Sequence, residues 1–209
     1  MAENNPDLHG NAPDKADGAL VLIDVINAFD FPGGEQLLQF ALPMAERIAA
    51  LKRRARAAGV PVVYVNDNFG RWRSDFRSQV DHCLEADSLG RPVVEMLMPE
   101  EVDYFVIKPK HSGFFATSLG TLLEYLRTKT VILTGVTADI CVLFTANDAY
   151  MRDYNLIVPR DCVASISEEE NEHALRQMEK ILKADVSPSS ELDLKILGVS
   201  TEHGARPRA

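Results

Sequence analysis

The chain has 209 residues, of which 46% are hydrophobic and 25% charged, so it is long enough to bury the core of an ordinary globular domain. Acidic side chains outnumber basic ones by 31 to 22, and the resulting net charge of -9 disfavours a nucleic-acid partner. Because no apolar run approaches the ~20 residues of a membrane-spanning helix and the first residues are polar and acidic, we expect a cytoplasmic protein with no membrane partner.

A single domain accounts for the regular patterns in the sequence. Residues 1–17 and 201–209 lack an apolar period and are expected to form flexible tails. Residues 18–200 contain no internal repeat and no linker rich in glycine, serine or proline. We therefore predict one domain over residues 18–200.

Short apolar runs alternate with helical patterns along this domain. Runs rich in Val, Ile or Tyr predict strands over residues 19–23, 60–65, 104–107, 131–133 and 156–158. Helical spacing of apolar residues predicts helices over residues 37–55, 119–128, 138–153, 168–183 and 191–197. Strands that are apolar throughout are buried on both faces, so the sequence predicts an α/β fold: a three-layer, doubly wound, mostly parallel sheet with helices on both faces.

Three chemically active side chains follow predicted strands. Asp24 ends the first strand, Lys108 ends the third, and Cys141 lies in the first turns of the helix after the fourth. Each residue alone is more often structural, but parallel strands bring their carboxyl ends to one edge, where small molecules bind. A helix N-terminus and a nearby ammonium lower the pKa of a thiol, and an adjacent carboxylate can carry its proton. The three positions together therefore favour an active site.

Four segments resemble the isochorismatase-like cysteine hydrolases, which include nicotinamidases and N-carbamoylsarcosine amidases. These segments are residues 19–29, 106–119, 134–142 and 145–150, and the likeness extends over residues 18–198. The second is similar to the family's Lys-Pro-Arg-Tyr-Ser-Ala-Phe segment and the third to its Gly-Val-Ala-Thr-Asn-x-Cys-Val turn. The resemblance implies the Rossmann-like isochorismatase fold.

The resemblance also implies roles for individual residues. Asp24, Lys108 and Cys141 would form the catalytic triad, with Lys110 as a competing candidate for the amine. A cis peptide bond would join Val136 to Thr137, and the N–H groups of Thr137 and Cys141 would form an oxyanion hole. Lys108 is preferred because the family's lysine lies directly at the strand end.

The expected reaction is hydrolysis of a small amide or N-carbamoyl C–N bond through a thioester on Cys141, with Asp24 as the general acid and base. Nicotinamidases bind a metal through an Asp-x-His motif, whereas residues 64–72 contain Asp67 but no histidine, so we expect no metal and no other cofactor. Two alternatives remain open. One is a vinyl-ether hydrolase that does not need the cysteine, and the other is a non-catalytic binding or redox-sensing module with a reactive Cys141.

The small-molecule pocket and the assembly are less constrained by the sequence. Residues 66–77 are interpreted either as a lid, in which Arg71 or Arg73 recognises a carboxylate, or as a loop that docks a second subunit. Members of the family commonly form dimers or tetramers, so we expect a homo-oligomer. The run of Lys52, Arg53 and Arg54 is expected to form a solvated helix face. The residues expected to line the pocket are Asn27, Phe29, Asn68, Trp72, Ser112 and Phe114.

Overall fold

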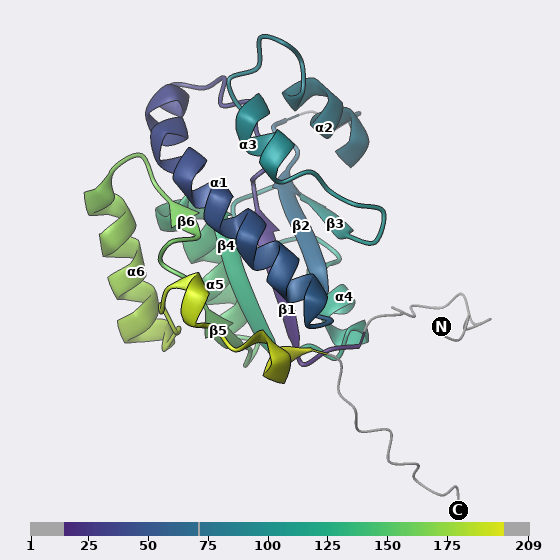
Figure 1. Ribbon diagram of the computed structural model, residues 1–209, viewed down its shortest axis with the longest axis vertical. Helices are drawn as coiled ribbons and strands as arrows, with labels where there is room; N and C mark the ends of the chain where they lie inside the picture. Colours follow the sequence, from purple (N-terminus) through teal and green to yellow (C-terminus); the bar gives the residue numbers. More distant parts are fainter. Residues whose placement is uncertain (1–14, 71, 199–209) are drawn as a thin grey trace, which may run out of the picture.

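The computed structural model describes residues 15–70 and 72–198, and within them one parallel sheet forms the centre of the molecule (Figure 1). The strand order is β3-β2-β1-β4-β5, with β6 paired to β4 beyond the end of β5. All pairings run parallel, which confirms the predicted doubly wound sheet. The strands are β1 (Gly18–Ile23), β2 (Val62–Asp67), β3 (Tyr104–Lys108), β4 (Thr130–Val136), β5 (Asn155–Ile157) and β6 (Val163–Ala164).

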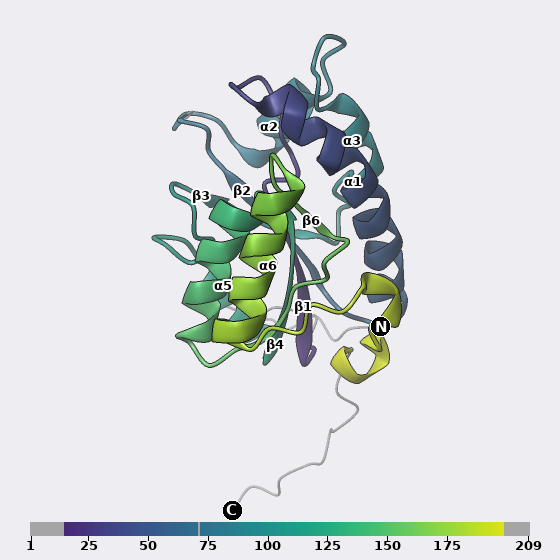
Figure 2. The ribbon, with the colours of Figure 1, turned by 90° about the vertical axis from the view of Figure 1, so that its left-hand side faces the viewer.

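Helices cover both faces of this sheet, as predicted. Figure 2 shows α1 and α3 on one side, with α5 and α6 on the other. Two short helices, α2 and α3, and the two-residue strand β6 were not predicted, because each is too short to show a period. The helical elements are α1 (Gly34–Ala57), α2 (Phe76–Cys83), α3 (Arg91–Met96), α4 (Leu119–Tyr125), η1 (Ala138–Val142), α5 (Leu143–Tyr150), α6 (Glu168–Leu182), η2 (Ser189–Glu191) and η3 (Leu194–Leu197).

The central strand β1 shows why the strands are apolar throughout. Leu20 and Leu22 lie in the hydrophobic cluster under α1, whereas Val21 and Ile23 lie in the cluster under α4, α5 and α6. Successive side chains of a strand point to opposite faces, so both sets are buried at once. The sheet therefore separates two cores, and the carboxyl ends of its strands remain available for a site.

Two predicted helices differ from the structure. The helix predicted over residues 138–153 begins as the π-helical segment η1, which carries Cys141, and continues as α5 only from Leu143. The helix predicted over residues 191–197 is replaced by the 3₁₀ turns η2 and η3. Asp193 caps η3 by accepting a hydrogen bond from the Lys195 N–H. Leu192, between the two turns, is buried against the α1 cluster, so tertiary packing decides this segment.

The expected N-terminal tail partly joins the domain. The N–H of Ala16 donates to the Leu126 carbonyl at 3.0 Å, and the Asp17 carbonyl accepts from the Thr130 N–H at 2.9 Å. Residues 1–14 and 201–209 lie outside the described residues. Within the described part of the chain, no helix combines the length and apolar character needed to cross a bilayer.

The prediction of a solvated face for Lys52, Arg53 and Arg54 is wrong for Lys52. Its ammonium lies 3.0 Å from Asp103 Oδ2 and donates to the Tyr64 hydroxyl at 2.7 Å. Residue 52 follows Ile48 by four positions and so falls on the buried stripe of α1. Arg54, although exposed, is bound through its guanidinium to the C-terminal turns at the Ser189 and Leu192 carbonyls. Arg53 is exposed as expected.

The buried ion pair between Lys52 and Asp103 yields a prediction for stability. Replacing Asp103 by alanine leaves an ammonium buried without its carboxylate, and burial already lowers the pKa of Lys52. We expect Asp103→Ala to lower the free energy of unfolding by about 3–5 kcal/mol in urea denaturation. The exposed Asp87→Ala serves as control, with an expected change within about 0.5 kcal/mol. Equal losses in the two variants would refute this role for the pair.

Candidate active site

The sheet edge brings together the acid, the amine and the thiol that the sequence singles out. Lys108 Nζ lies 2.9 Å from Asp24 Oδ2 and 3.6 Å from Cys141 Sγ. Asp24 and Lys108 are buried, and Cys141 is half-buried. Lys110, the competing amine, is exposed to solvent. This geometry supports the choice of Lys108.

Asp24 is held by backbone groups from β2. It follows β1 with a left-handed φ of 52°, and its N–H donates to the Val65 carbonyl at 3.0 Å. Its Oδ1 accepts from the Asp67 N–H at 2.7 Å, which leaves Oδ2 on the ammonium of Lys108. The carboxylate is therefore fixed in one orientation before any substrate binds.

The turn after β4 positions Cys141 at the carboxyl edge of the sheet. The peptide bond between Val136 and Thr137 is cis, which confirms the expectation drawn from the family resemblance. Gly135, which precedes Val136 in β4, has a φ of +111°, and a Cβ built on it would lie 2.0 Å from the Ile23 carbonyl oxygen. Position 135 of β4 therefore requires glycine, because β1 and β4 approach too closely there for any side chain.

Gly135→Ala is expected to destabilise the fold, because both the backbone conformation and the close approach exclude a Cβ. We expect the free energy of unfolding to fall by at least about 3 kcal/mol in urea denaturation. Gly120→Ala in α4 is the matched control, since the nearest atom to its Cβ lies 3.8 Å away on Phe114. Gly120 is the second residue of α4 and its Cβ would meet no close neighbour, so the control should keep its stability within about 0.5 kcal/mol. A tolerated Gly135→Ala would contradict this account of the turn.

The pKa shifts at the site differ from the sequence expectation of a lowered pKa for the Cys141 thiol. Burial raises the pKa of Asp24, although the Lys108 ammonium opposes the shift. Burial opposes the charge of Lys108, yet Asp24, Cys141 and Asp67 outweigh it and raise its pKa. Burial and the Asp24 carboxylate raise the pKa of the Cys141 thiol, and Lys108 offsets this only in part. The pKa of the Cys141 thiol is therefore shifted in the direction opposite to the one expected from the helix N-terminus and the ammonium.

Asp67 is a member of this cluster that the sequence analysis did not assign to it. Its Oδ2 accepts from Lys108 Nζ at 3.2 Å, and its Oδ1 accepts from the Phe69 N–H at 2.7 Å. It pairs with Lys108 in the register of β2 and β3, at the carboxyl end of its strand. The signal was therefore present, because Asp67 is the last residue of β2 and Asp24 directly follows β1.

His111 is a second neighbour of the thiol. Its Nδ1 lies 3.9 Å from Cys141 Sγ, and its ring lies 5.5 Å from that of Phe144 between centroids. His111 is exposed, whereas Asp24 and Lys108 are buried. The imidazole therefore lies at the solvent side of the thiol.

Most of the residues expected in the substrate pocket are buried and already hydrogen-bonded or packed. Asn27 accepts from the Phe29 N–H at 2.8 Å, and the Phe29 ring lies in the α1 cluster. Ser112 bonds the Asp148 carboxylate and accepts from the Phe114 N–H at 3.1 Å. The Phe114 ring belongs to the core under α4, α5 and α6. Of these residues, Asn27 borders a cavity of about 40 Å³ together with Phe69, Gln79 and Cys83.

Part of the segment of residues 66–77 holds the neighbouring backbone in place by hydrogen bonds. The Asn66 amide is fully buried and bonds both the N–H and the carbonyl of Ile26, which fixes the chain after Asp24. Asn68 accepts from the Gly70 N–H at 2.9 Å, and Asp75 caps α2. Trp72 is 77% exposed, and Arg71 lies outside the described residues. The lid and the subunit-docking interpretations both stay predictions.

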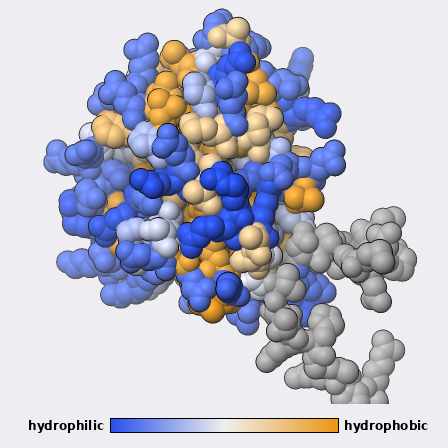
Figure 3. Space-filling view, in the orientation of Figure 1, coloured by the Kyte–Doolittle hydropathy of each residue, from blue (hydrophilic) through white to orange (hydrophobic). Residues whose placement is uncertain are grey.

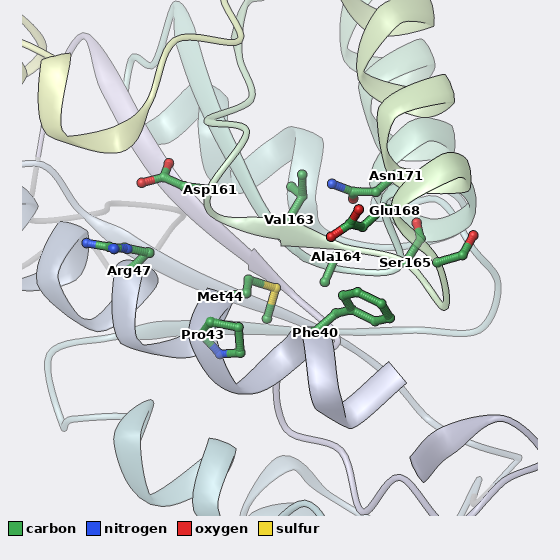
Figure 4. A pocket seen from close by; sticks show the side chains of 11 residues that line it. Phe40, Pro43, Met44, Arg47, Asp161, Val163, Ala164, Ser165, Glu168 and Asn171 are labelled. Atoms are coloured by element: carbon green, nitrogen blue, oxygen red, sulfur yellow. The ribbon is translucent and has the colours of Figure 1, made fainter. Parts of the chain in front are cut away.

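A separate hollow of about 240 Å³ lies between α1 and the segment from β6 to α6 (Figure 4). Phe40 and Met44 of α1 face Val163 and Ala164 across it. None of the predicted site residues lines this hollow.

In the described part of the chain, no three His, Cys, Asp or Glu side chains are grouped as metal ligands would be. The space-filling view over α1 shows mostly polar side chains with small apolar areas between them (Figure 3).

Comparison with known proteins assigns the family. The family model described as the isochorismatase domain matches residues 18–189. The chain belongs to the isochorismatase family. This confirms the resemblance in the sequence and makes the chain a hydrolase of that family.

Individual isochorismatase-family relatives agree with this assignment. The chain is 43% identical to the uncharacterized isochorismatase family protein YaaI of Bacillus subtilis, over 85% of this chain and 97% of that protein. It is 31% identical to the ureidoacrylate amidohydrolase RutB of Methylorubrum extorquens, over 68% of this chain and 67% of that protein. The crystal structure of N-carbamoylsarcosine amidase from Thermoplasma acidophilum superposes with a TM-score of 0.64 at 29% identity, covering 85% of this chain and 99% of that one.

Proposed function

We propose that this isochorismatase-family hydrolase cleaves a C–N bond of a small amide or N-carbamoyl compound, without a metal, through a thioester on Cys141. The single observation that carries the proposal is the buried Lys108 ammonium in contact with both Asp24 Oδ2 and Cys141 Sγ. Relatives named as a ureidoacrylate amidohydrolase and an N-carbamoylsarcosine amidase support the choice of bond.

In the first half of the reaction, Asp24 takes the proton of the Cys141 thiol as the sulfur attacks the carbonyl carbon. A C–S bond forms and the carbonyl oxygen becomes an oxyanion. The N–H groups of Thr137 and Cys141 are proposed to hold this oxyanion, and the Lys108 ammonium stabilises the negative charges during the transfer. The raised pKa of Asp24 suits it to hold the proton inside the site.

In the second half, the tetrahedral intermediate collapses and the C–N bond breaks. Asp24 gives its proton to the leaving nitrogen, so ammonia or an amine departs and a thioester remains on Cys141. Asp24 then takes a proton from water as the oxygen attacks the thioester carbon. The C–S bond breaks, the sulfur regains a proton from Asp24, and the acid product leaves.

We also propose that residues 18–200 form the catalytic domain and that the enzyme works as a homo-oligomer on a small molecule. Exposed aromatic side chains, among them Trp72, Phe105 and Phe144, support self-association. Light scattering on the purified chain tests it, with a dimer or tetramer expected and a monomer as the opposing result. The cytoplasmic location stays a prediction from sequence.

The reaction class is tested by ammonia release from a panel of primary amides and N-carbamoyl compounds. We expect turnover of at least one compound, unaffected by a chelator. A vinyl-ether hydrolase would release no ammonia from the panel but would cleave an enol-ether substrate. A non-catalytic sensing module would turn over neither class. Either of these outcomes would overturn the proposed reaction.

A further inference from the structure

Asp67 shares the active-site ammonium with Asp24. Lys108 Nζ lies 3.2 Å from Asp67 Oδ2 and 2.9 Å from Asp24 Oδ2. The same residue reaches Asp24 through its backbone, whose N–H donates to Asp24 Oδ1 at 2.7 Å. Asp67 therefore contacts both charged partners of the Cys141 thiol by separate groups.

Asp67 is itself held firmly. Its Oδ1 accepts from the Phe69 N–H at 2.7 Å, and its carbonyl accepts from Gln79 Nε2 at 3.1 Å. Gln79 is buried on α2, so this helix braces the end of β2. The carboxylate is only one-quarter exposed, which limits screening of its charge by solvent.

The charges around the thiol do not cancel. Two carboxylates, Asp24 and Asp67, share the single ammonium of Lys108, so the trio carries a net charge of about −1 when all are ionised. From the segment after β3, His111 faces the sulfur at 3.9 Å. From η1, Asp139 is bonded to the Ser165 hydroxyl at 2.6 Å. A second carboxylate on the ammonium thus weakens the field that would favour a thiolate.

We propose that Asp67 is a positioning residue. Its carboxylate pairs with the Lys108 ammonium together with Asp24, and this shared pairing keeps the Cys141 proton within the site until substrate arrives. The backbone N–H of Asp67 orients Asp24. The carboxylate of Asp67 reduces the stabilisation that the Lys108 ammonium would give to a thiolate on Cys141. Premature ionisation of the thiol is thereby suppressed. The catalytic use of this arrangement rests on the proposed function, but the charge effect on the thiol does not.

The test measures the rate of Cys141 alkylation by iodoacetamide between pH 7 and 10, with the modified residue identified by peptide mass. Iodoacetamide reacts with the thiolate, so the rate reports the ionised fraction. Asp67→Asn removes the charge and keeps the size of the side chain. We expect its rate profile to move to lower pH by about 0.5–1 unit, which corresponds to about 3–10-fold faster alkylation below the midpoint.

Two further variants separate charge from structure. Asp67→Glu retains the charge and should restore a profile close to wild type, whereas a merely structural role predicts that both variants lose stability without a shift. The exposed Asp81→Asn makes the same charge change on the outside of α2 and should leave the profile unchanged. Superimposable profiles for wild type and folded Asp67→Asn would overturn the inference, even if ammonia release confirms the proposed reaction.

Discussion

Cys141→Ala is expected to abolish amide hydrolysis, with kcat lower by about 10⁴-fold or more. The sulfur lies 3.6 Å from Lys108 Nζ, and no other nucleophilic side chain is assigned a covalent role in the proposed reaction. Without the sulfur, no nucleophilic side chain attacks the carbonyl carbon, and water would have to attack the amide directly. The measurement is steady-state ammonia release on the best substrate of the panel.

Cys162→Ala is the matched control for this experiment. Cys162 is fully buried in the α1 cluster, so its thiol is not accessible to a substrate, and burial raises the pKa of this thiol to about 12. We expect the control to lose some stability and to keep its kcat within about threefold. If Cys141→Ala kept more than about a tenth of the wild-type kcat, a non-covalent mechanism would replace the proposed one.

Asp24→Asn is expected to lower kcat by about 10²–10⁴-fold, the usual contribution of a general acid and base. The amide oxygen can still accept from the Asp67 N–H, and Asp67 still pairs with Lys108, so the variant should fold. What it loses is the group that carries the proton from the thiol to the leaving nitrogen. The measurement is kcat together with the melting temperature.

The pH profile gives a second readout on Asp24. Since burial raises its pKa above the ordinary value of 3.8, activity should fall on acidification at a pH above that value, as the base becomes protonated. This acidic limb should be absent from the residual activity of Asp24→Asn. Asp30→Asn, an exposed change in the same loop, should retain both the limb and the rate. An unchanged acidic limb in Asp24→Asn would remove Asp24 from its proposed role.

The sheet could be predicted from sequence because its strands are buried on both faces. Leu20 and Val21 serve different cores, so the run that contains them has no polar interruption and stands out. By contrast, β6 has two residues and α3 has six, too few to show a period. Lys52 was misplaced because charge alone predicts exposure, while its position on the α1 stripe and its pairing with Asp103 decide its burial.

The site was predictable where a side chain stands at the carboxyl end of a strand. Asp24 and Lys108 were recognised in this way, and the register of β2 with β3 places Asp67 beside Lys108 by the same rule. The pKa of Cys141 was not predictable, since it depends on how deeply the sulfur is buried and how close the carboxylate lies. Those quantities arise only when β1, β3 and η1 come together in the folded chain.

The thioester on Cys141 is the covalent intermediate of the proposed reaction, and rapid-quench mass spectrometry of the wild-type enzyme can detect it. The enzyme is mixed with the best amide substrate, quenched in acid during turnover, and digested to locate any adduct. We predict a mass increase equal to the acyl group, confined to the peptide that contains Cys141 and removed by hydroxylamine. Steady ammonia release with no adduct on wild type, accompanied by undiminished turnover in Cys141→Ala, would contradict the covalent mechanism.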